Sequence, residues 1–217
     1  MKTMDLSVLY NLSYGLYIVG AFKNGKAVGC TINTCFQITS DTPRVAVSLN
    51  KNNHTLEAVL QNGRFSVSIL SEDSDPAIIG RFGFMSSRDT DKYEGRGYEV
   101  IDYVPCVNGR FAGRLILEVE QTVDCGTHML IIARLTDTVK GEGTPMTYAY
   151  YHNVIKGKEP KNAPTYRGDS TGKDVTAKRR FECGVCGYIA ETEGEDLPAD
   201  YICPICSVDR SNFTEID

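Results

Sequence analysis

Residues 183–206 read CGVCGYIAETEGEDLPADYICPIC, a stretch that holds two Cys-x-x-Cys pairs with 16 residues between them. Cysteine thiolates are soft anionic ligands, and two such pairs can close a tetrahedral site around zinc or iron. The spacing does not choose the metal, and on spacing alone a zinc ribbon is the commoner answer. We expect one metal ion bound by Cys183, Cys186, Cys203 and Cys206.

The segment around these cysteines, residues 181–217, is too short to be stable through hydrophobic burial alone. In modules of this size, the free energy of metal binding supplies much of the free energy of folding. Its few large apolar or aromatic side chains are Phe181, Tyr188, Ile189, Leu197, Tyr201, Ile202 and Phe213. The sequence therefore predicts a small domain that packs around its metal site.

Charge is distributed unevenly along the 217 residues, whose formal net charge is −5. Residues 156–180 carry eight Lys or Arg against three Asp or Glu, together with prolines and glycines, which is typical of a linker. Residues 181–217 carry one basic residue against nine acidic ones, which argues against binding to nucleic acid. We expect a first domain at 1–156, a basic linker at 157–180 and an acidic domain at 181–217.

Neither a membrane span nor a secretory signal is indicated. No stretch approaches the roughly 18 consecutive apolar residues that a bilayer requires, and the first five residues show no basic-then-apolar pattern. We expect a cytoplasmic protein with no membrane partner. Thiols in a reducing compartment seldom form disulfides, which favours metal binding as the role of paired cysteines.

The first domain is rich in short runs of β-branched and aromatic residues, at 14–21, 26–33, 44–49, 64–70, 113–120 and 129–135. Such runs predict strands, and turn signals such as Asn24-Gly25 separate them. Helices are expected at 54–61, after a polar run that can cap it, and at 74–82, where Pro76 lies near the start. Six or more strands with few helices predict a mainly β domain built as a barrel.

The C-terminal domain resembles a rubredoxin, in its two cysteine pairs, in Leu197-Pro-Ala-Asp-Tyr-Ile-Cys-Pro-Ile-Cys206 and in the closing Phe213. The resemblance implies one iron ion, Fe3+ or Fe2+, held by the four cysteines and carrying single electrons; a structural zinc ribbon is the alternative. Tyr201 stands where a tryptophan is usual, and Ser207 stands where a glycine is usual. Because glycine tolerates positive φ, Ser207 implies local strain or an altered turn.

The first domain resembles the flavin-reductase-like, FMN-binding split barrels, in particular the flavoredoxin branch. The matching segments are Gly29–Gln37, Pro43–Lys51, His54-Thr55 and Gly126–His128. A split β-barrel followed by a rubredoxin-like metal-binding domain makes the whole chain similar to the high-molecular-weight rubredoxins of anaerobic bacteria. This resemblance implies a mainly β fold and FMN as the cofactor.

Two polar segments of the first domain suit an FMN molecule. Residues 50–55 would place amides, a cation and a hydroxyl at a helix N-terminus, which suits a phosphate, although an ordinary capping turn is the alternative. Residues 31–37 offer donors and acceptors at a strand end, which suits the polar edge of the flavin ring or simple strand-end hydrogen bonding. With the resemblance, the expected FMN-binding residues are Thr31, Asn33, Thr34, Cys35, Gln37, Ser48, Leu49, Asn50, Lys51, Asn52, His54 and Thr55.

No catalytic side chain is expected, because hydride transfer to a flavin does not demand a general base. His128, in the family's Gly-x-His position, and His152 are the candidates for a place near the flavin or the nicotinamide; a turn residue and a surface residue are the alternatives. The segment 80–93 is expected to close over the site or to form a solvated loop. The chain lacks a Gly-x-Gly-x-x-Gly motif, so a nicotinamide would bind over the flavin rather than in a Rossmann domain.

These resemblances imply an NAD(P)H-dependent oxidoreductase that passes electrons through FMN to an iron centre. They also imply a homodimer with the flavin near the subunit interface, and a redox partner such as a flavo-diiron protein that reduces oxygen or nitric oxide. Weak redox encounters use small interfaces helped by complementary charge, which suits the acidic C-terminal domain. The alternative is a flavin reductase that supplies reduced flavin and carries a structural zinc ribbon.

Overall fold

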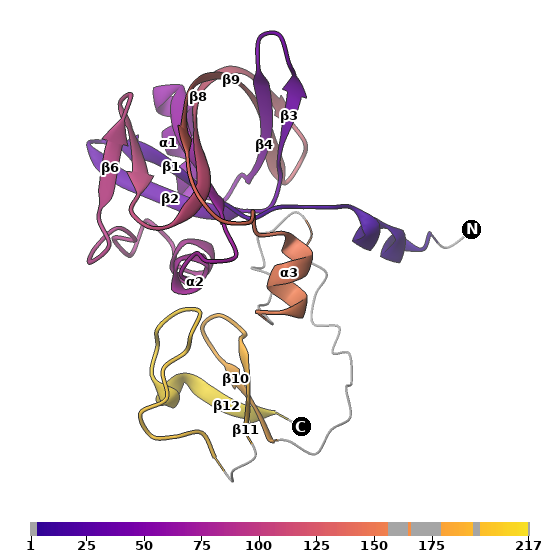
Figure 1. Cartoon of the computed structure of the whole chain (residues 1–217), viewed down its shortest axis with the longest axis vertical. Helices are drawn as coiled ribbons and strands as arrows, with labels where there is room; N and C mark the ends of the chain where they lie inside the picture. The colour runs from indigo at the N-terminus through magenta and orange to yellow at the C-terminus, as the bar shows by residue number, and fades with distance from the viewer. Residues whose placement is uncertain (1–3, 156–164, 166–178, 193–195, 217) are drawn as a thin grey trace.

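The computed structural model describes residues 4–155, 165, 179–192 and 196–216. Figure 1 shows a curled sheet with helices at one end and, beneath them, a small separate module. The expected linker at 157–180 lies outside the described residues except for Thr165, Arg179 and Arg180. Among the described residues, no helix is long and apolar enough to cross a membrane.

The first domain is a seven-stranded antiparallel sheet in the order β2-β1-β5-β8-β9-β4-β3. Its strands are β1 (Tyr17–Lys23), β2 (Lys26–Ile32), β3 (Cys35–Thr39), β4 (Arg44–Asn50), β5 (Arg64–Leu70), β8 (Phe111–Asp124) and β9 (His128–Lys140). β2 and β3 are the two edges of the sheet, yet only Asn33 and Thr34 join them. Because this connection spans at most about 11 Å, the sheet has to curl until its edges approach. The expected split barrel is confirmed.

Helix α1 (His54–Asn62) packs into the barrel core. Asn53 caps its start, with Oδ1 accepting a hydrogen bond from the Thr55 N–H at 3.0 Å. Gly63, at φ 67°, ends the helix in the left-handed conformation that glycine tolerates. Leu56, Ala58 and Val59 are buried against strand residues, so the helix fills the barrel and leaves its N-terminus at the split.

Two further helices, α2 (Ala77–Phe84) and α3 (Tyr148–Asn153), cover one end of the barrel. α2 begins directly after Pro76, whose fixed φ suits a helix start. Its residues Ile78, Ile79 and Phe82 are buried in a second core cluster with Tyr151 of α3. A hairpin of β6 (Tyr98–Ile101) and β7 (Val104–Val107) lies beside the sheet.

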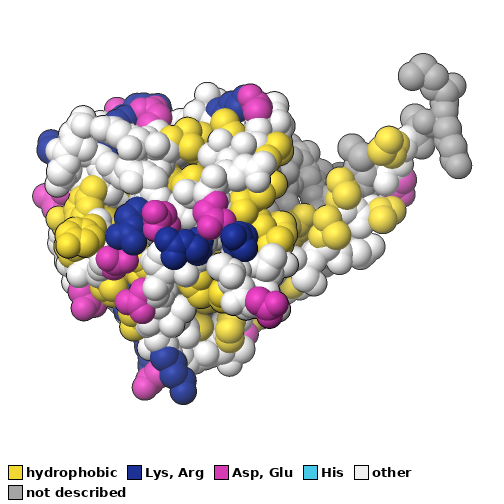
Figure 2. All heavy atoms as spheres, turned by 90° about the horizontal axis from the view of Figure 1, so that it is seen from above, with side chains coloured by type: hydrophobic (Ala, Val, Ile, Leu, Met, Phe, Trp, Pro, Cys, Tyr) yellow, Lys and Arg dark blue, Asp and Glu magenta, His cyan; other side chains and the backbone are white. Residues whose placement is uncertain are grey.

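The N-terminal 3-10 helix η1 (Leu6–Asn11) projects away from the barrel. Figure 2 shows this arm with apolar side chains on its surface. Val8 is 64% exposed and Leu9 54% exposed.

The C-terminal module is a three-stranded antiparallel sheet in the order β11-β10-β12. The strands are β10 (Arg179–Cys183), β11 (Ile189–Thr192) and β12 (Phe213–Ile216), with a short 3-10 helix η2 (Arg210–Asn212) before the last. β10 begins at Arg179, two residues before the expected start of the domain at 181. Phe181, Leu197 and Phe213 pack around the four cysteines. The rings of Tyr201 and Phe213 pack edge to face, with their centroids 5.3 Å apart. The cysteines therefore lie in the centre of the module's core.

Candidate functional site

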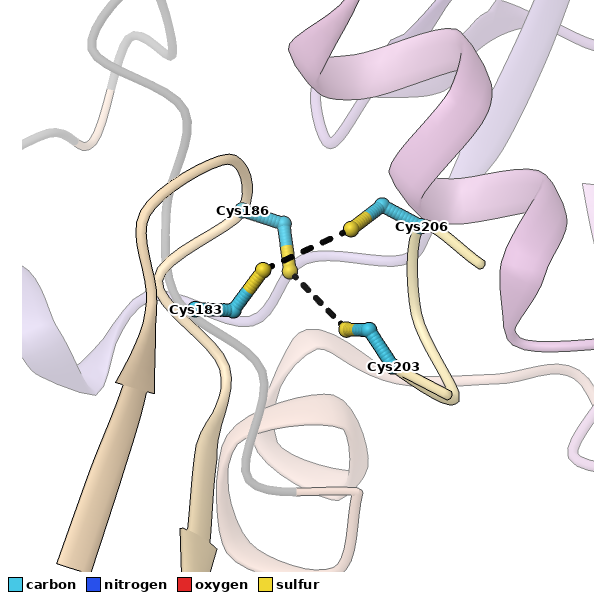
Figure 3. Close-up of side chains that lie close together, drawn as sticks. All are labelled: Cys183, Cys186, Cys203 and Cys206. Atoms are coloured by element: carbon cyan, nitrogen blue, oxygen red, sulfur yellow. Dashed lines mark hydrogen bonds between the residues drawn. The ribbon is translucent and has the colours of Figure 1, made fainter. Parts of the chain in front are cut away.

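The Sγ atoms of the four paired cysteines lie close together in the C-terminal module, all within 4.8 Å of one another. Cys183 Sγ lies 3.6 Å from Cys206 Sγ, and Cys186 Sγ lies 3.5 Å from Cys203 Sγ (Figure 3). A tetrahedral ion with bonds of about 2.3 Å separates its sulfur ligands by about 3.8 Å. The four residues expected from their spacing therefore fit a single tetrahedral metal ion.

The two Cys-x-x-Cys turns have the same backbone geometry. The Gly187 N–H donates to the Cys183 carbonyl at 2.8 Å, and the Ser207 N–H donates to the Cys203 carbonyl at 2.9 Å. Gly187 has φ 70° and Ser207 has φ 61°. Both turns thus end in the left-handed conformation, which directs the cysteine side chains of each pair toward the same centre.

Ser207 holds this conformation without being a glycine, and we expect Ser207→Gly to stabilise the module. A left-handed φ costs an L-residue roughly 1–2 kcal/mol, and part of this gain is offset because glycine has more freedom in the unfolded chain. The net gain should be about 0.5–1 kcal/mol. It is measured as a higher guanidinium midpoint for the loss of metal–thiolate absorbance. Ser207→Ala keeps the strain, so an equal gain in both variants would contradict this explanation.

The thiols of Cys203 and Cys206 differ in acidity. The hydrogen bond with the Cys186 thiol lowers the pKa of Cys203, while burial raises the pKa of Cys206. A metal ion displaces the remaining thiol protons, so binding is weaker at lower pH.

A cavity of about 180 Å³ opens at the split of the barrel. The polar lining residues are Thr31, Asn33, Ser48, Asn50, Asn52, Asn53, His54, Ser86, Ser87 and Lys92; the apolar wall includes Leu16, Ile32, Phe82, Phe84, Met85 and Tyr148. The N-terminus of α1 opens into the cavity, and its backbone N–H groups and helix dipole favour an anion.

Six of the twelve expected FMN-binding residues line this cavity: Thr31, Asn33, Ser48, Asn50, Asn52 and His54. The other six do not. Along β4, Ser48 and Asn50 face the cavity, while Leu49 between them is buried in the core, because alternate residues of a strand point to opposite faces. The roles of the residues that line the cavity stay predictions.

The remaining expected residues have other contacts. Lys51 Nζ pairs with Asp124 at 2.6 Å, and Gln37 Nε2 donates to the Thr39 carbonyl at 2.9 Å on the exposed strand β3. Thr34 Oγ1 donates to Asn33 Oδ1 at 3.1 Å, so it contacts the cavity only through its neighbour. The other two are Cys35, whose pKa burial raises to about 12, and the buried Thr55.

Lys92 is a lining residue that sequence reasoning missed. Its side chain is buried, and Nζ donates to the carbonyls of Gly29 at 2.9 Å and Phe82 at 3.0 Å. Burial lowers the pKa of Lys92 to about 8. The only sequence signal was its place in the segment 80–93, which borders the cavity along Phe82–Ser87.

The three histidines lie at different distances from the cavity. His54 lines it, and burial together with the nearby Lys23 lowers the pKa of His54. His152 does not line it but packs edge-on against Tyr148, which does, with ring centroids 4.4 Å apart. His128 begins β9, with Nδ1 2.9 Å from Thr127 Oγ1, and does not line the cavity.

Thr165 connects two lining residues of the cavity by hydrogen bonds. Asn33 Nδ2 donates to Thr165 Oγ1 at 2.8 Å, and Thr165 Oγ1 donates to the Tyr148 hydroxyl at 3.2 Å. Both Asn33 and Tyr148 line the cavity. A residue far along the chain is thereby fixed beside the split between β2 and β3.

Comparisons with known proteins give separate matches for the barrel and for the C-terminal module. A family model described as a flavin reductase like domain matches residues 9–157, and a rubrerythrin, rubredoxin-like domain matches residues 181–214. A high molecular weight rubredoxin from Moorella thermoacetica is 39% identical, with 98% of this chain and 100% of the relative covered. A ferric-chelate reductase (NAD(P)H) from Archaeoglobus fulgidus is also 39% identical, over 75% of this chain and 98% of the relative.

Solved structures of flavin reductases have the same barrel. The styrene monooxygenase flavin reductase from Pseudomonas putida S12 superposes with a TM-score of 0.57 at 26% identity. The match covers 65% of this chain and 90% of that one. The barrel and the cysteine module are thus each similar to a separate group of known proteins.

Proposed function

This chain belongs to the flavin reductase like family and, with its rubredoxin-like C-terminal domain, to the high molecular weight rubredoxins; from this premise we propose that it carries electrons from NAD(P)H through FMN to iron. The observation that carries the proposal is that one chain holds both a polar-lined cavity at a helix N-terminus and a tetracysteine site. The Archaeoglobus relative is named for NAD(P)H, which supports a nicotinamide as the donor.

The donor set of the cavity fits FMN. The α1 N-terminus with Asn50 and Asn52 would hold the phosphate, and Thr31, Asn33 and Ser48 would hold the polar edge of the ring. A bound flavin accepts two electrons as hydride and can release them singly. The protein's own part is to orient the cofactor and to cover it with the apolar wall, while His54 and Lys92 supply titratable groups.

The four cysteines would hold iron in the rubredoxin manner, and the absorption spectrum of the purified protein tests this together with FMN. We expect flavin bands and ferric–thiolate bands, both bleached by NADH or NADPH under anaerobic conditions. A colourless C-terminal domain that contains stoichiometric zinc would contradict the proposal. That result would favour a flavin reductase with a structural zinc ribbon.

The affinity for FMN should fall as the pH rises above about 8, because of Lys92. The pKa of Lys92 is about 8 without a ligand, and a bound anion raises it, since opposite charge favours the protonated form. Binding therefore takes up a proton above pH 8, and the affinity can fall by up to about tenfold per pH unit. Fluorescence titration of apoprotein with FMN between pH 7 and 9 measures the slope, which Lys92→Gln should flatten.

The proposed assembly is a homodimer that meets a further redox protein. Support for the dimer comes from exposed apolar side chains on the edge strand β3, where Phe36 is 54% and Ile38 44% exposed, next to the cavity-bordering connection. Support for the partner comes from the acidic C-terminal domain, because charge complementarity speeds weak redox encounters. A flavo-diiron protein is the proposed acceptor, and the domain boundaries 1–156, 157–180 and 181–217 are part of the same proposal.

A further inference from the structure

Helix α2 touches the backbone of the second cysteine turn at Gly80. A Cβ atom added at position 80 would lie 2.0 Å from the Ile205 carbonyl oxygen and 2.9 Å from Cys206 Cα. Real Cβ atoms do not approach backbone this closely, so a larger residue at position 80 requires the module to move. Figure 3 shows a helix of the barrel domain passing beside Cys206.

The composition of α2 fits a contact helix. Its eight residues include both Gly80 and Gly83, although glycine in a helix interior is destabilising. Ile78, Ile79 and Phe82 anchor the helix in the barrel core, which leaves Gly80 to face the module. The glycine thus lowers helix stability at a position where the backbone of the metal-binding turn approaches.

The opposite side of the same segment borders the cavity. Phe84 lines the cavity and also packs against the core cluster around the four cysteines. Met85 lines the cavity and also a groove that includes Cys206 and Ser207. At Phe84, one side chain separates the cavity from the cysteine cluster.

We propose that the Gly80 face of α2 is an internal docking surface that holds the metal site against the cavity wall, with Phe84 and Met85 between the two centres. The inference rests on the proposed function and adds the route within one chain. Because electron tunnelling slows steeply with distance, a fixed contact between the module and α2 sets the rate of electron transfer. A tether alone only raises the local concentration of the metal site near the flavin. Each transfer would move one electron from the reduced flavin to Fe3+, giving Fe2+; the second electron of a hydride would follow after the redox partner has reoxidised the iron, and the flavin would release its proton to solvent.

Gly80→Leu in the holoprotein tests the docking surface. The leucine side chain should separate the module from α2 and slow the reduction of iron by about tenfold or more, because only the tether then brings the centres together. The reduction of the flavin by NAD(P)H should keep its rate. Stopped-flow absorbance follows the reduction of the flavin and the reduction of the iron. The control is Gly113→Ala in β8, where the nearest atom to an added Cβ is 3.4 Å away, and it should change neither rate.

Amide hydrogen exchange of the same holoproteins gives a readout that is independent of turnover. In Gly80→Leu, exchange should rise at residues 77–84 and 203–208, with iron and flavin contents unchanged. Unchanged exchange would show that the contact does not form in solution. Faster exchange with an unchanged rate of iron reduction would show that the contact is not the electron route. Either result overturns the proposal. If NAD(P)H does not reduce the flavin of the wild-type protein, the proposed function is refuted. The exchange comparison still tests docking in that case.

Discussion

Cys203→Ser should abolish the ferric–thiolate absorbance and unfold the C-terminal module, while NAD(P)H still reduces the flavin in the barrel. Among the described residues of this module, nine form the buried core, and four of them are the cysteines. Structural metal ions contribute about 10–16 kcal/mol in modules of this size, so the remaining apolar contacts cannot keep it folded. Cys203 supplies one of the four Sγ atoms of the site, so its loss leaves only three thiolate ligands.

Cys125→Ser is the matched control, because Cys125 is an exposed cysteine of the barrel, outside the tetracysteine site. It should keep both spectra and the rate of iron reduction. Metal content by atomic spectroscopy and amide exchange over residues 179–192 and 196–216 distinguish loss of metal from loss of fold. A Cys203→Ser protein with a protected module and bound iron would refute the metal-centred account of this domain.

Asn50→Asp should lower the affinity for FMN by about thirtyfold to a thousandfold while leaving the affinity for riboflavin nearly unchanged. Asn50 lines the cavity beside the N-terminus of α1, and its Oδ1 accepts a hydrogen bond from the Asn52 N–H at 2.9 Å. A carboxylate keeps this acceptor and the side-chain shape but adds a negative charge. At an effective dielectric of about 20, a nearby like charge costs roughly 2–4 kcal/mol, and only FMN carries the phosphate.

Asn24→Asp adds the same charge in the turn between β1 and β2 and serves as the control, since Asn24 does not line the cavity. Equilibrium titration of the apoprotein with each flavin gives the two affinities. An equal loss for FMN and riboflavin in Asn50→Asp would mean that the residue contacts the ring or shapes the cavity, and that the phosphate binds elsewhere.

Strand positions could be predicted where turn chemistry bounds the pattern. Asn24 and Gly25 both have positive φ, and the turn pairs Lys23 with Lys26, as the Asn-Gly signal predicts. The run at 64–70 is β5 without change. β3 was missed because its five residues lie at an edge and are mostly exposed, so no buried alternating face marks it. β8 and β9 are longer than predicted because their outer ends are polar and exposed, with no apolar pattern to extend the strands.

The cluster of four cysteines could be predicted from the sequence, whereas the cavity could be predicted only in part. Two Cys-x-x-Cys pairs at this spacing indicate a tetrahedral site, although the spacing does not choose the metal. Lys92 and Phe84 reach the cavity through the tertiary fold, and nothing local distinguishes them from loop residues. From the sequence alone, Gly80 is a residue that weakens a helix. The structure explains it, because the Ile205 carbonyl lies where a Cβ atom would be.

Anaerobic titration of the holoprotein with NADH or NADPH tests the central claim most directly. Two electrons reduce the flavin and one reduces the iron, so both sets of bands should bleach completely at about 1.5 equivalents of hydride donor per chain. The ferric–thiolate bands should disappear without any added carrier protein. Bleaching that ends at about one equivalent, with the ferric bands unchanged, would contradict electron transfer from flavin to iron within this protein.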